Sequence, residues 1–234
     1  MSRKVLIVVA NPSTHPTLGY PVGFWASELF HPIAVFEAEG ISYDIVSPDG
    51  GPVILDPMSD PSDASGYSSW DQVSKTFIDK GFMDGLGNTA AINTINVDDY
   101  DAIMVAGGQS PMFTFDGATS LHDTFGNFYN SGKVTAALCH GVAVLNFVKD
   151  ENDDFLATGK TVTGFTNEEE EAANAAVQTE VMPWRIEDAL TEKGAIFRKA
   201  GPWEPYAVAD GNLVTGQQNM SGEVTAKKIV SLLK

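Results

Sequence analysis

The feature that most constrains the fold of this chain is a short, continuous run of mostly β-branched residues near the N-terminus. Residues 5–9 read VLIVV, with no polar residue at alternate positions. A strand with this pattern is buried on both faces, which is typical of a parallel sheet covered by helices on both sides. Similar runs occupy residues 41–46, 102–106, 134–138 and 161–165. The intervals between them are long enough for crossover helices, so we expect an α/β fold with a mostly parallel central sheet.

Helical patterns fill several of these intervals. Residues 24–40 carry apolar side chains at helical spacing, although Pro32 is expected to kink or split that helix. Residues 184–192 form a second pattern, and residues 222–233 predict a closing helix that covers one face of the sheet. Residues 47–71 are rich in Pro, Gly, Ser and Asp without a clear period, so we expect a long, ordered loop there.

Composition excludes several classes of protein. The chain is 43% hydrophobic and 19% charged, which is the composition of a globular protein, and we expect a single domain over residues 1–234. A net charge of −17 with only 14 Lys and Arg disfavours nucleic acid and anionic membranes as partners. The apolar run at residues 5–10 is too short to span a membrane. One cysteine cannot form an internal disulfide, so we expect a cytoplasmic protein.

That single cysteine is the first candidate for chemistry. Cys139 directly follows the predicted strand 134–138, and residues 142–148 have a helical pattern, so the thiol is expected at a strand-to-helix turn. Ligands of α/β proteins bind at this edge of the sheet, and the start of a helix lowers the pKa of a thiol. His140 could take up a proton, and backbone N–H groups at the helix start could stabilise an oxyanion. The alternative is that Cys139 is a small buried core residue.

A glycine pair follows another predicted strand. Gly107 and Gly108 come directly after residues 102–106, so they are expected at the same edge of the sheet, where their backbone could approach a substrate closely. A plain tight turn explains the pair equally well.

Several ordered segments together resemble a known family. They are GFWASEL from Gly23, SPDGGPVILDP from Ser47, AGGQSPMFTF from Ala106, ALCHG from Ala137, VTGFTNEEE from Val162 and LVTGQQNMS from Leu213. In this order they resemble the DJ-1/PfpI superfamily, and within it the Hsp31-like group that includes glutathione-independent glyoxalase III enzymes. The resemblance covers nearly the whole chain. It implies a flavodoxin-like α/β sandwich with a strained nucleophile elbow.

The resemblance also assigns roles to individual residues. It implies that Cys139 is the nucleophile, that His140 is its catalytic partner, and that Glu28 shuttles protons beside the thiol. Without it, Glu28 reads as a solvated acid on a helix. The acid that orients His140 is implied to be Glu170, with Glu169 as the alternative within the four consecutive glutamates 168–171.

The chain departs from the family's pattern at the glycine pair. Many Hsp31-like proteins read GGHG where this chain has Gly107-Gly108-Gln109-Ser110. Gln109 can donate and accept hydrogen bonds but cannot titrate, so the preferred substrate can differ from that of a typical glyoxalase. The candidate oxyanion and substrate-binding residues are therefore Gly107, Gly108, Gln109 and Gly141. His15, His31 and His122 lack metal-ligand spacing, so no metal is expected, and the proposed reaction needs no cofactor.

The resemblance implies a glyoxalase III-type lyase that converts 2-oxoaldehydes such as methylglyoxal to 2-hydroxy acids such as lactate through a cysteine thiohemiacetal. Two alternatives stay open. One is a stress-response chaperone or redox sensor in which Cys139 is oxidised. The other is an amidase, a peptidase-like protein or an isonitrile hydratase with the same site. Related proteins are often dimeric, so a homodimer is expected, with a small carbonyl compound as the partner.

Overall fold

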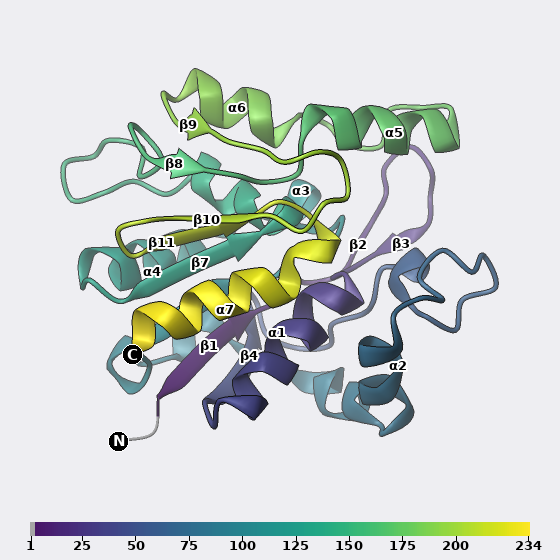
Figure 1. Ribbon diagram of the computed structural model, residues 1–234, viewed down its shortest axis with the longest axis horizontal. Helices are drawn as coiled ribbons and strands as arrows, with labels where there is room; N and C mark the ends of the chain where they lie inside the picture. The colour runs from purple at the N-terminus through teal and green to yellow at the C-terminus, as the bar shows by residue number, and fades with distance from the viewer. Residues whose placement is uncertain (1–2) are drawn as a thin grey trace.

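A computed structural model describes residues 3–234 of the chain. Its centre is a seven-stranded sheet in the order β10-β11-β7-β6-β1-β4-β5 (Figure 1). All neighbouring strands are parallel except β10 and β11, which are antiparallel. The bounds are Lys4–Val8 (β1), Ser42–Ser47 (β4), Ala90–Ala91 (β5), Ala102–Val105 (β6), Val134–Leu138 (β7), Ala207–Asp210 (β10) and Leu213–Gly216 (β11). The expected mostly parallel α/β fold is confirmed, and with it the strands predicted at 5–9, 41–46, 102–106 and 134–138.

The strand predicted at 161–165 is wrong as a member of this sheet. Only Thr161–Val162 form a strand, β8, and it pairs in a separate small sheet with β9, Ile196–Phe197. The segment reaches the central sheet through a side chain instead, because the backbone N–H of Thr163 donates to Oγ1 of Thr215 at 2.8 Å. The place beside β7 belongs to β11, which the sequence interpretation did not identify as a strand.

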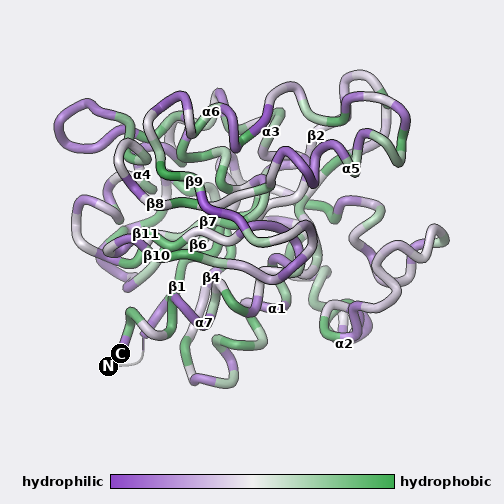
Figure 2. The backbone as a smooth tube through the Cα atoms, turned by 45° about the horizontal axis from the view of Figure 1, so that its top comes forward, coloured by the Kyte–Doolittle hydropathy of each residue, from purple (hydrophilic) through white to green (hydrophobic). Residues whose placement is uncertain are grey.

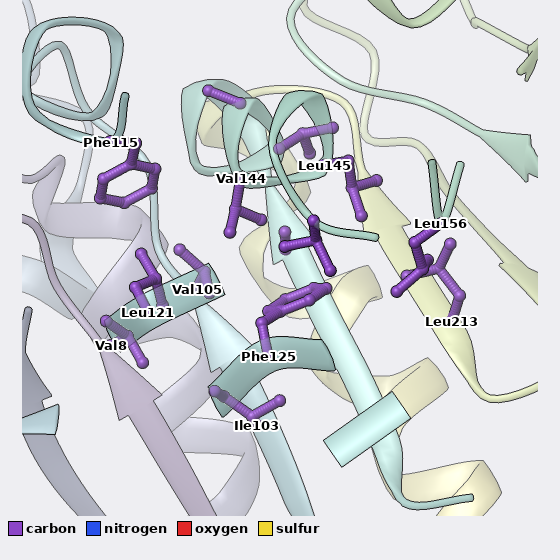
Figure 3. Close-up of a cluster of buried hydrophobic side chains, with 14 of the residues drawn as sticks. Val8, Ile103, Val105, Phe115, Leu121, Phe125, Val144, Leu145, Leu156 and Leu213 are labelled. Atoms are coloured by element: carbon purple, nitrogen blue, oxygen red, sulfur yellow. The ribbon is translucent and has the colours of Figure 1, made fainter. Parts of the chain in front are cut away.

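Helices cover both faces of the sheet. Side chains of β1 alternate between two cores, with Leu6 and Val8 in one and Val5 and Ile7 in the other. Figure 3 shows the first core, in which Phe125 of helix α4 (Thr119–Asn130) lies against the strands. The second core includes α1 (Ala26–Ala38) and the closing helix α7 (Gly222–Leu233), which lie side by side across the other face (Figure 1). Hydrophobic segments accordingly gather at the centre of the fold (Figure 2).

Pro32 does not split helix α1, contrary to the sequence-based expectation. The helix runs continuously from Ala26 to Ala38 with Pro32 buried in its middle. Packing against α7 and the sheet holds the helix together where one backbone hydrogen bond is lost.

The remaining elements lie around the edges of the sheet. Residues 47–71 form an ordered loop with a single 3-10 turn, η1 (Pro57–Ser59), as expected. The other elements have the following bounds: β2 Ser13–Thr14, β3 Pro21–Val22, α2 Gln72–Asp79, η2 Phe82–Asn88, η3 Ile92–Thr94, η4 Val97–Asp99, α3 Pro111–Thr114, η5 Cys139–Asn146, α5 Asn167–Val177, α6 Ile186–Glu192 and η6 Asn219–Ser221. No helix among residues 3–234 is long and apolar enough to cross a membrane.

Candidate active site

Cys139 stands at the carboxyl end of β7 in a strained backbone conformation. Its φ angle is 54°, in the left-handed region that residues other than glycine rarely adopt. Helix η5 begins at Cys139 itself and is a 3-10 helix, where the sequence predicted a helix over 142–148. Gly141 makes this turn possible, because a Cβ atom there would lie 2.7 Å from the carbonyl oxygen of Val105. The backbone of the elbow is therefore pressed against the end of β6.

His140 connects the thiol to a carboxylate. Its Nδ1 lies 3.7 Å from Sγ of Cys139, and its Nε2 lies 2.8 Å from Oε1 of Glu170. A carboxylate only accepts hydrogen bonds, so the Nε2–H donates to Glu170 and the neutral ring keeps Nδ1 free to accept a proton from the thiol. The ring of Phe165 packs on the imidazole, with centroids 4.3 Å apart. The three side chains thus form a line from thiol to imidazole to carboxylate.

Helix α5 buries two of the four consecutive glutamates and exposes the other two. Its N-cap is Thr166, whose hydroxyl accepts from the backbone N–H of Glu169, while the Glu169 side chain accepts from the backbone N–H of Thr166. This capping box fixes the first turn. Glu169 and Glu170 are buried, whereas Glu168 and Glu171 are exposed. Of the two candidates for orienting His140, the structure places Glu170 beside the ring.

Glu169 instead holds Trp203, a residue of the cavity lining, in position. Its Oε1 accepts from the backbone N–H of Trp203 at 3.0 Å and from Nε2 of Gln217 at 2.9 Å. Trp203 has a φ angle of 64°, so this hydrogen bond holds it in an unfavourable conformation. Its indole packs edge-on against Phe165, which in turn packs on His140.

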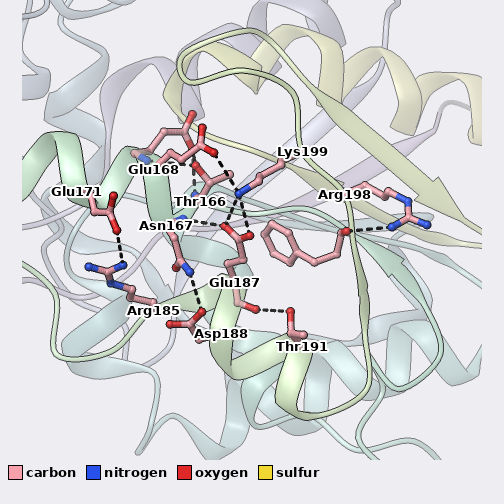
Figure 4. A network of polar contacts seen from close by, with 12 residues as sticks. Thr166, Asn167, Glu168, Glu171, Arg185, Glu187, Asp188, Thr191, Arg198 and Lys199 are labelled. Atoms are coloured by element: carbon pink, nitrogen blue, oxygen red, sulfur yellow. Dashed lines mark hydrogen bonds and ion pairs between the residues drawn. The ribbon is translucent and has the colours of Figure 1, made fainter.

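The outer side of α5 is tied to its neighbours (Figure 4). Glu171 pairs with Arg185, and Asn167 donates to Asp188 at the start of α6. Lys199 pairs with both Glu168 and Glu187. These contacts hold the helix beside the site.

Glu28 lies in the first turn of α1 with its carboxyl group fully buried. Its Oε2 accepts from the backbone N–H of Gly107 at 2.8 Å, and its carboxyl also interacts with the Cys139 thiol. Burial raises the pKa of Glu28 to about 8. A solvated acid is therefore the wrong reading of this residue.

The thiol pKa is not lowered as the position at a helix start predicted. Burial, and then the charge and hydrogen bond of Glu28, raise the pKa of Cys139 well above its usual range, and the backbone N–H of His140 offsets only part of this. The eight-residue 3-10 helix contributes too little to overcome burial. Glu28 and Cys139 are neighbouring buried acids and cannot both ionise easily. The first proton lost is therefore a property of the coupled pair and is not assigned to either group alone.

Gly107 and Gly108 let other parts of the chain pack closely against their backbone. Gly108 has a φ angle of 110°, and a Cβ atom there would lie 2.5 Å from the carbonyl oxygen of Gly23. A Cβ atom on Gly107 would lie 2.5 Å from Oε2 of Glu28. Only glycine fits at both positions.

Asp56 accepts backbone hydrogen bonds that hold the loop after the glycine pair in place. The side chain is fully buried and accepts from the backbone N–H groups of Gly23 at 3.2 Å and Gln109 at 2.6 Å. Burial raises its pKa to about 7. This residue lies within a segment that carried the family resemblance, but its role was not recognised from the sequence.

Gln109 is held by Tyr20, which the sequence interpretation also missed. The Tyr20 hydroxyl donates to Oε1 of Gln109 at 2.8 Å. The carbonyl end of the amide is therefore occupied, and its two N–H groups are left to donate. Both side chains line the cavity described next.

One cavity of about 490 Å³ brings the candidate residues together. Its lining includes Glu28, Gly108, Gln109, Cys139, His140 and Glu170. Gly107 and Gly141 do not line it and act through backbone packing. The lining also includes apolar residues, among them Trp25, Trp203 and one face of α5.

The other histidines have structural partners. His15 bonds to the Val181 carbonyl through Nε2 at 2.7 Å, and His122 bonds to the Phe115 carbonyl at 2.7 Å. His31 lies 2.8 Å from Asp71, the N-cap of α2. Across residues 3–234, no group of three or more His, Cys, Asp or Glu side chains is arranged to hold a metal ion.

Comparison with known proteins places this site in context. The sequence profile of the DJ-1/PfpI family matches residues 20–232. The glutathione-independent glyoxalase HSP31 of Saccharomyces cerevisiae is 30% identical, over 99% of this chain and 98% of that protein. Glyoxalase 3 of Candida albicans is 26% identical, over 99% and 98%.

Solved structures agree over the full length. The rapid encystment protein of Francisella tularensis has a TM-score of 0.89 at 32% identity, covering 99% of each chain. The crystal structure of glyoxalase III from Candida albicans has a TM-score of 0.79 at 25% identity, covering 98% of this chain and 96% of that one.

Proposed function

The chain belongs to the DJ-1/PfpI family, and on this premise we propose that it is a glutathione-independent glyoxalase of the Hsp31-like group. The proposed reaction converts a 2-oxoaldehyde and water to a 2-hydroxy acid, with methylglyoxal giving lactate. Several relatives bear the name glutathione-independent glyoxalase or glyoxalase 3. The observation that carries the proposal is the line Cys139–His140–Glu170 in the lining of a cavity, with the Glu28 carboxyl also beside the thiol.

The first step is addition of the thiol to the aldehyde. Nδ1 of His140 takes the proton of Cys139, and the sulfur bonds to C1 of the substrate to give a thiohemiacetal. Glu170 stabilises the imidazolium that forms, because it accepts from Nε2. The strained backbone of Cys139 presents the sulfur to the cavity.

Backbone N–H groups stabilise the developing oxygen charge. The N–H of His140 lies at the thiol, and Gly108 also lines the cavity. Donors of this kind contribute about 10²- to 10³-fold in rate when aimed at an oxyanion. In this mechanism the N–H groups of Gln109, whose Oε1 is occupied by Tyr20, donate to the carbonyl oxygen at C2.

The remaining steps move one proton and add one water. A base, Glu28 or His140, removes the proton on C1, electrons move through an enediol, and C2 receives a proton, which leaves a thioester at C1 and a hydroxyl at C2. Water then attacks the thioester, releasing the 2-hydroxy acid and the thiol. C1 is oxidised and C2 is reduced within one molecule, so the reaction balances without an external oxidant or reductant. A buried carboxyl with a pKa of about 8 can hold and release a proton in this pH range.

The test is a substrate panel with mass spectrometry of the protein. Methylglyoxal, a primary amide, a peptide and an isonitrile are each incubated with wild-type protein at low temperature, and the mass of Cys139 is followed. We expect a transient adduct of one methylglyoxal on Cys139 and none from the other compounds. An adduct from the amide or the isonitrile alone would assign the site to a different reaction.

Three further proposals concern the protein as a whole. A homodimer is supported by the frequent dimers among similar proteins and is tested by light scattering coupled to size exclusion. A cytoplasmic location is supported by the single unpaired thiol. That residues 1–234 form one domain is tested by limited proteolysis.

A further inference from the structure

The cavity is much larger than a methylglyoxal molecule needs. Its volume of about 490 Å³ lies in the range of sites that enclose drug-sized ligands. The groups with a role in the proposed chemistry make up only part of its lining. The reacting carbons C1 and C2 therefore need only part of the cavity, and the rest is available to whatever is attached to C2.

The rest of the lining is largely apolar. It includes Trp25, Met58, Phe165, Val181, Met182 and Trp203. Flat aromatic side chains and methionines favour an apolar or aromatic ligand group, because they offer a large contact area with few polar groups to satisfy.

Small residues on α5 leave space in the apolar part of the cavity. Ala172, Ala173, Ala176 and Val177 line the cavity, and their spacing of three and four places them on one face of the helix. The capping box and the ion pairs of Figure 4 hold α5 in place, so the space beside the alanines is a fixed feature of the site.

The charge around the cavity limits the ligand further. No Lys or Arg belongs to its lining in the described part of the chain, whereas Glu28 and Glu170 do. The net charge of −17 opposes the approach of anions as well. A substituent that carries a carboxylate or phosphate would find no counter-charge.

We propose that the preferred substrates are 2-oxoaldehydes with a bulky, uncharged, apolar or aromatic group on C2. This group packs between α5 and the aromatic side chains of Trp25, Phe165 and Trp203. This proposal rests on the proposed glyoxalase function. The aryl compound phenylglyoxal represents the class, and its product is mandelate. The bond changes are those given for methylglyoxal, since the group on C2 takes no part in them.

The test compares phenylglyoxal with methylglyoxal under glutathione-free conditions. Packing of apolar groups in a pocket changes kcat/KM by about 10- to 200-fold per group, so we expect kcat/KM for phenylglyoxal to exceed that for methylglyoxal by about tenfold or more. Turnover of methylglyoxal with no advantage for phenylglyoxal overturns this inference and leaves the proposed function standing. Turnover of neither compound overturns both.

A matched pair of variants assigns the effect to α5. Ala176→Leu places a larger side chain in the lining of the cavity, whereas Ala175→Leu makes the same change at the preceding residue, which is likewise exposed but does not line it. We expect Ala176→Leu to lower the ratio of the two kcat/KM values at least fivefold, about 1 kcal/mol, and Ala175→Leu to leave the ratio unchanged. Equal ratios in both variants would contradict the placement of the substituent against α5.

Discussion

His140 donates from Nε2 to Oε1 of Glu170 across 2.8 Å, which turns the opposite ring nitrogen toward the Cys139 sulfur. The hydrogen bond fixes both the tautomer and the direction of the imidazole. The acid comes from the first turn of α5, far along the chain from the elbow, so the site exists only once the helix is capped and docked.

The first prediction concerns this hydrogen bond. In Glu170→Gln the amide can donate to Nε2, which favours the wrong tautomer and removes the charge that stabilises the imidazolium. Loss of general acid–base assistance of this kind lowers rates by about 10²- to 10⁴-fold, so we expect kcat with methylglyoxal to fall by about 10²-fold or more. Steady-state kinetics check it. The control is Glu171→Gln on the same helix, which is exposed and is expected to keep wild-type kcat. An unchanged kcat in Glu170→Gln would remove His140 from the proposed mechanism.

The second prediction concerns the neighbouring acid. Glu169→Ala leaves the Thr166 and Trp203 N–H groups without their side-chain acceptor and removes the shortest of the hydrogen bonds that the Gln217 amide donates. Hydrogen bonds to charged groups contribute about 1.5–3 kcal/mol each, and a lost partner is costly in a buried site. We expect the free energy of unfolding to fall by about 3 kcal/mol, measured by urea denaturation. Glu168→Ala, at an exposed position, is expected to cost under about 1 kcal/mol.

The third prediction concerns Tyr20. Tyr20→Phe removes the donor that fixes the Gln109 amide, so the amide can rotate and its N–H groups are no longer held for the substrate. A typical hydrogen bond contributes about 0.5–1.5 kcal/mol, so we expect kcat/KM to fall by about 3- to 10-fold. If the Tyr20→Phe variant binds and turns over methylglyoxal like the wild type, Gln109 does not orient the substrate.

The fourth prediction follows from the titration of Glu28. Burial raises its pKa from 4.5 to about 8, so between these values the folded state keeps a proton that the unfolded state has lost. The stability contributed by this group is complete below about pH 4.5 and is lost as the pH rises through about 8. Glu28→Gln cannot titrate. Its free energy of unfolding relative to the wild type should therefore increase from pH 5 to pH 8 in urea denaturation. A difference that stays constant with pH would contradict the raised pKa.

The central strands could be predicted from sequence because their burial on both faces produces local apolar runs. The run at 161–165 misled because only two of its residues form a strand, and a hydrogen bond from the Thr163 N–H to the Thr215 side chain replaces sheet pairing. Strands β10 and β11 form a hairpin around Gly211 and Asn212, a local turn signal that was not used, whereas the pairing of β11 with β7 joins segments far apart in sequence.

Cys139 and His140 were proposed as nucleophile and base from their place after a buried strand, and the structure has them directly after β7. The choice between Glu169 and Glu170 had a signal that was not used: Thr166 followed three residues later by Glu169 is a capping box, which turns Glu169 back toward the helix start. The raised pKa of Cys139 and the partner of Gln109 could not be read from the sequence. The first arises from burial of the thiol and then from Glu28, the second is Tyr20, and only the folded chain brings these about.

The central claim is that Cys139 converts 2-oxoaldehydes to 2-hydroxy acids without glutathione. Its most direct test is lactate formation from methylglyoxal in glutathione-free buffer, followed by proton NMR, for the wild type and for Cys139→Ala. The account predicts lactate from the wild type and none above the uncatalysed rate from Cys139→Ala, with circular dichroism showing that the variant is folded. No lactate from the wild type, or equal rates from both proteins, would contradict it.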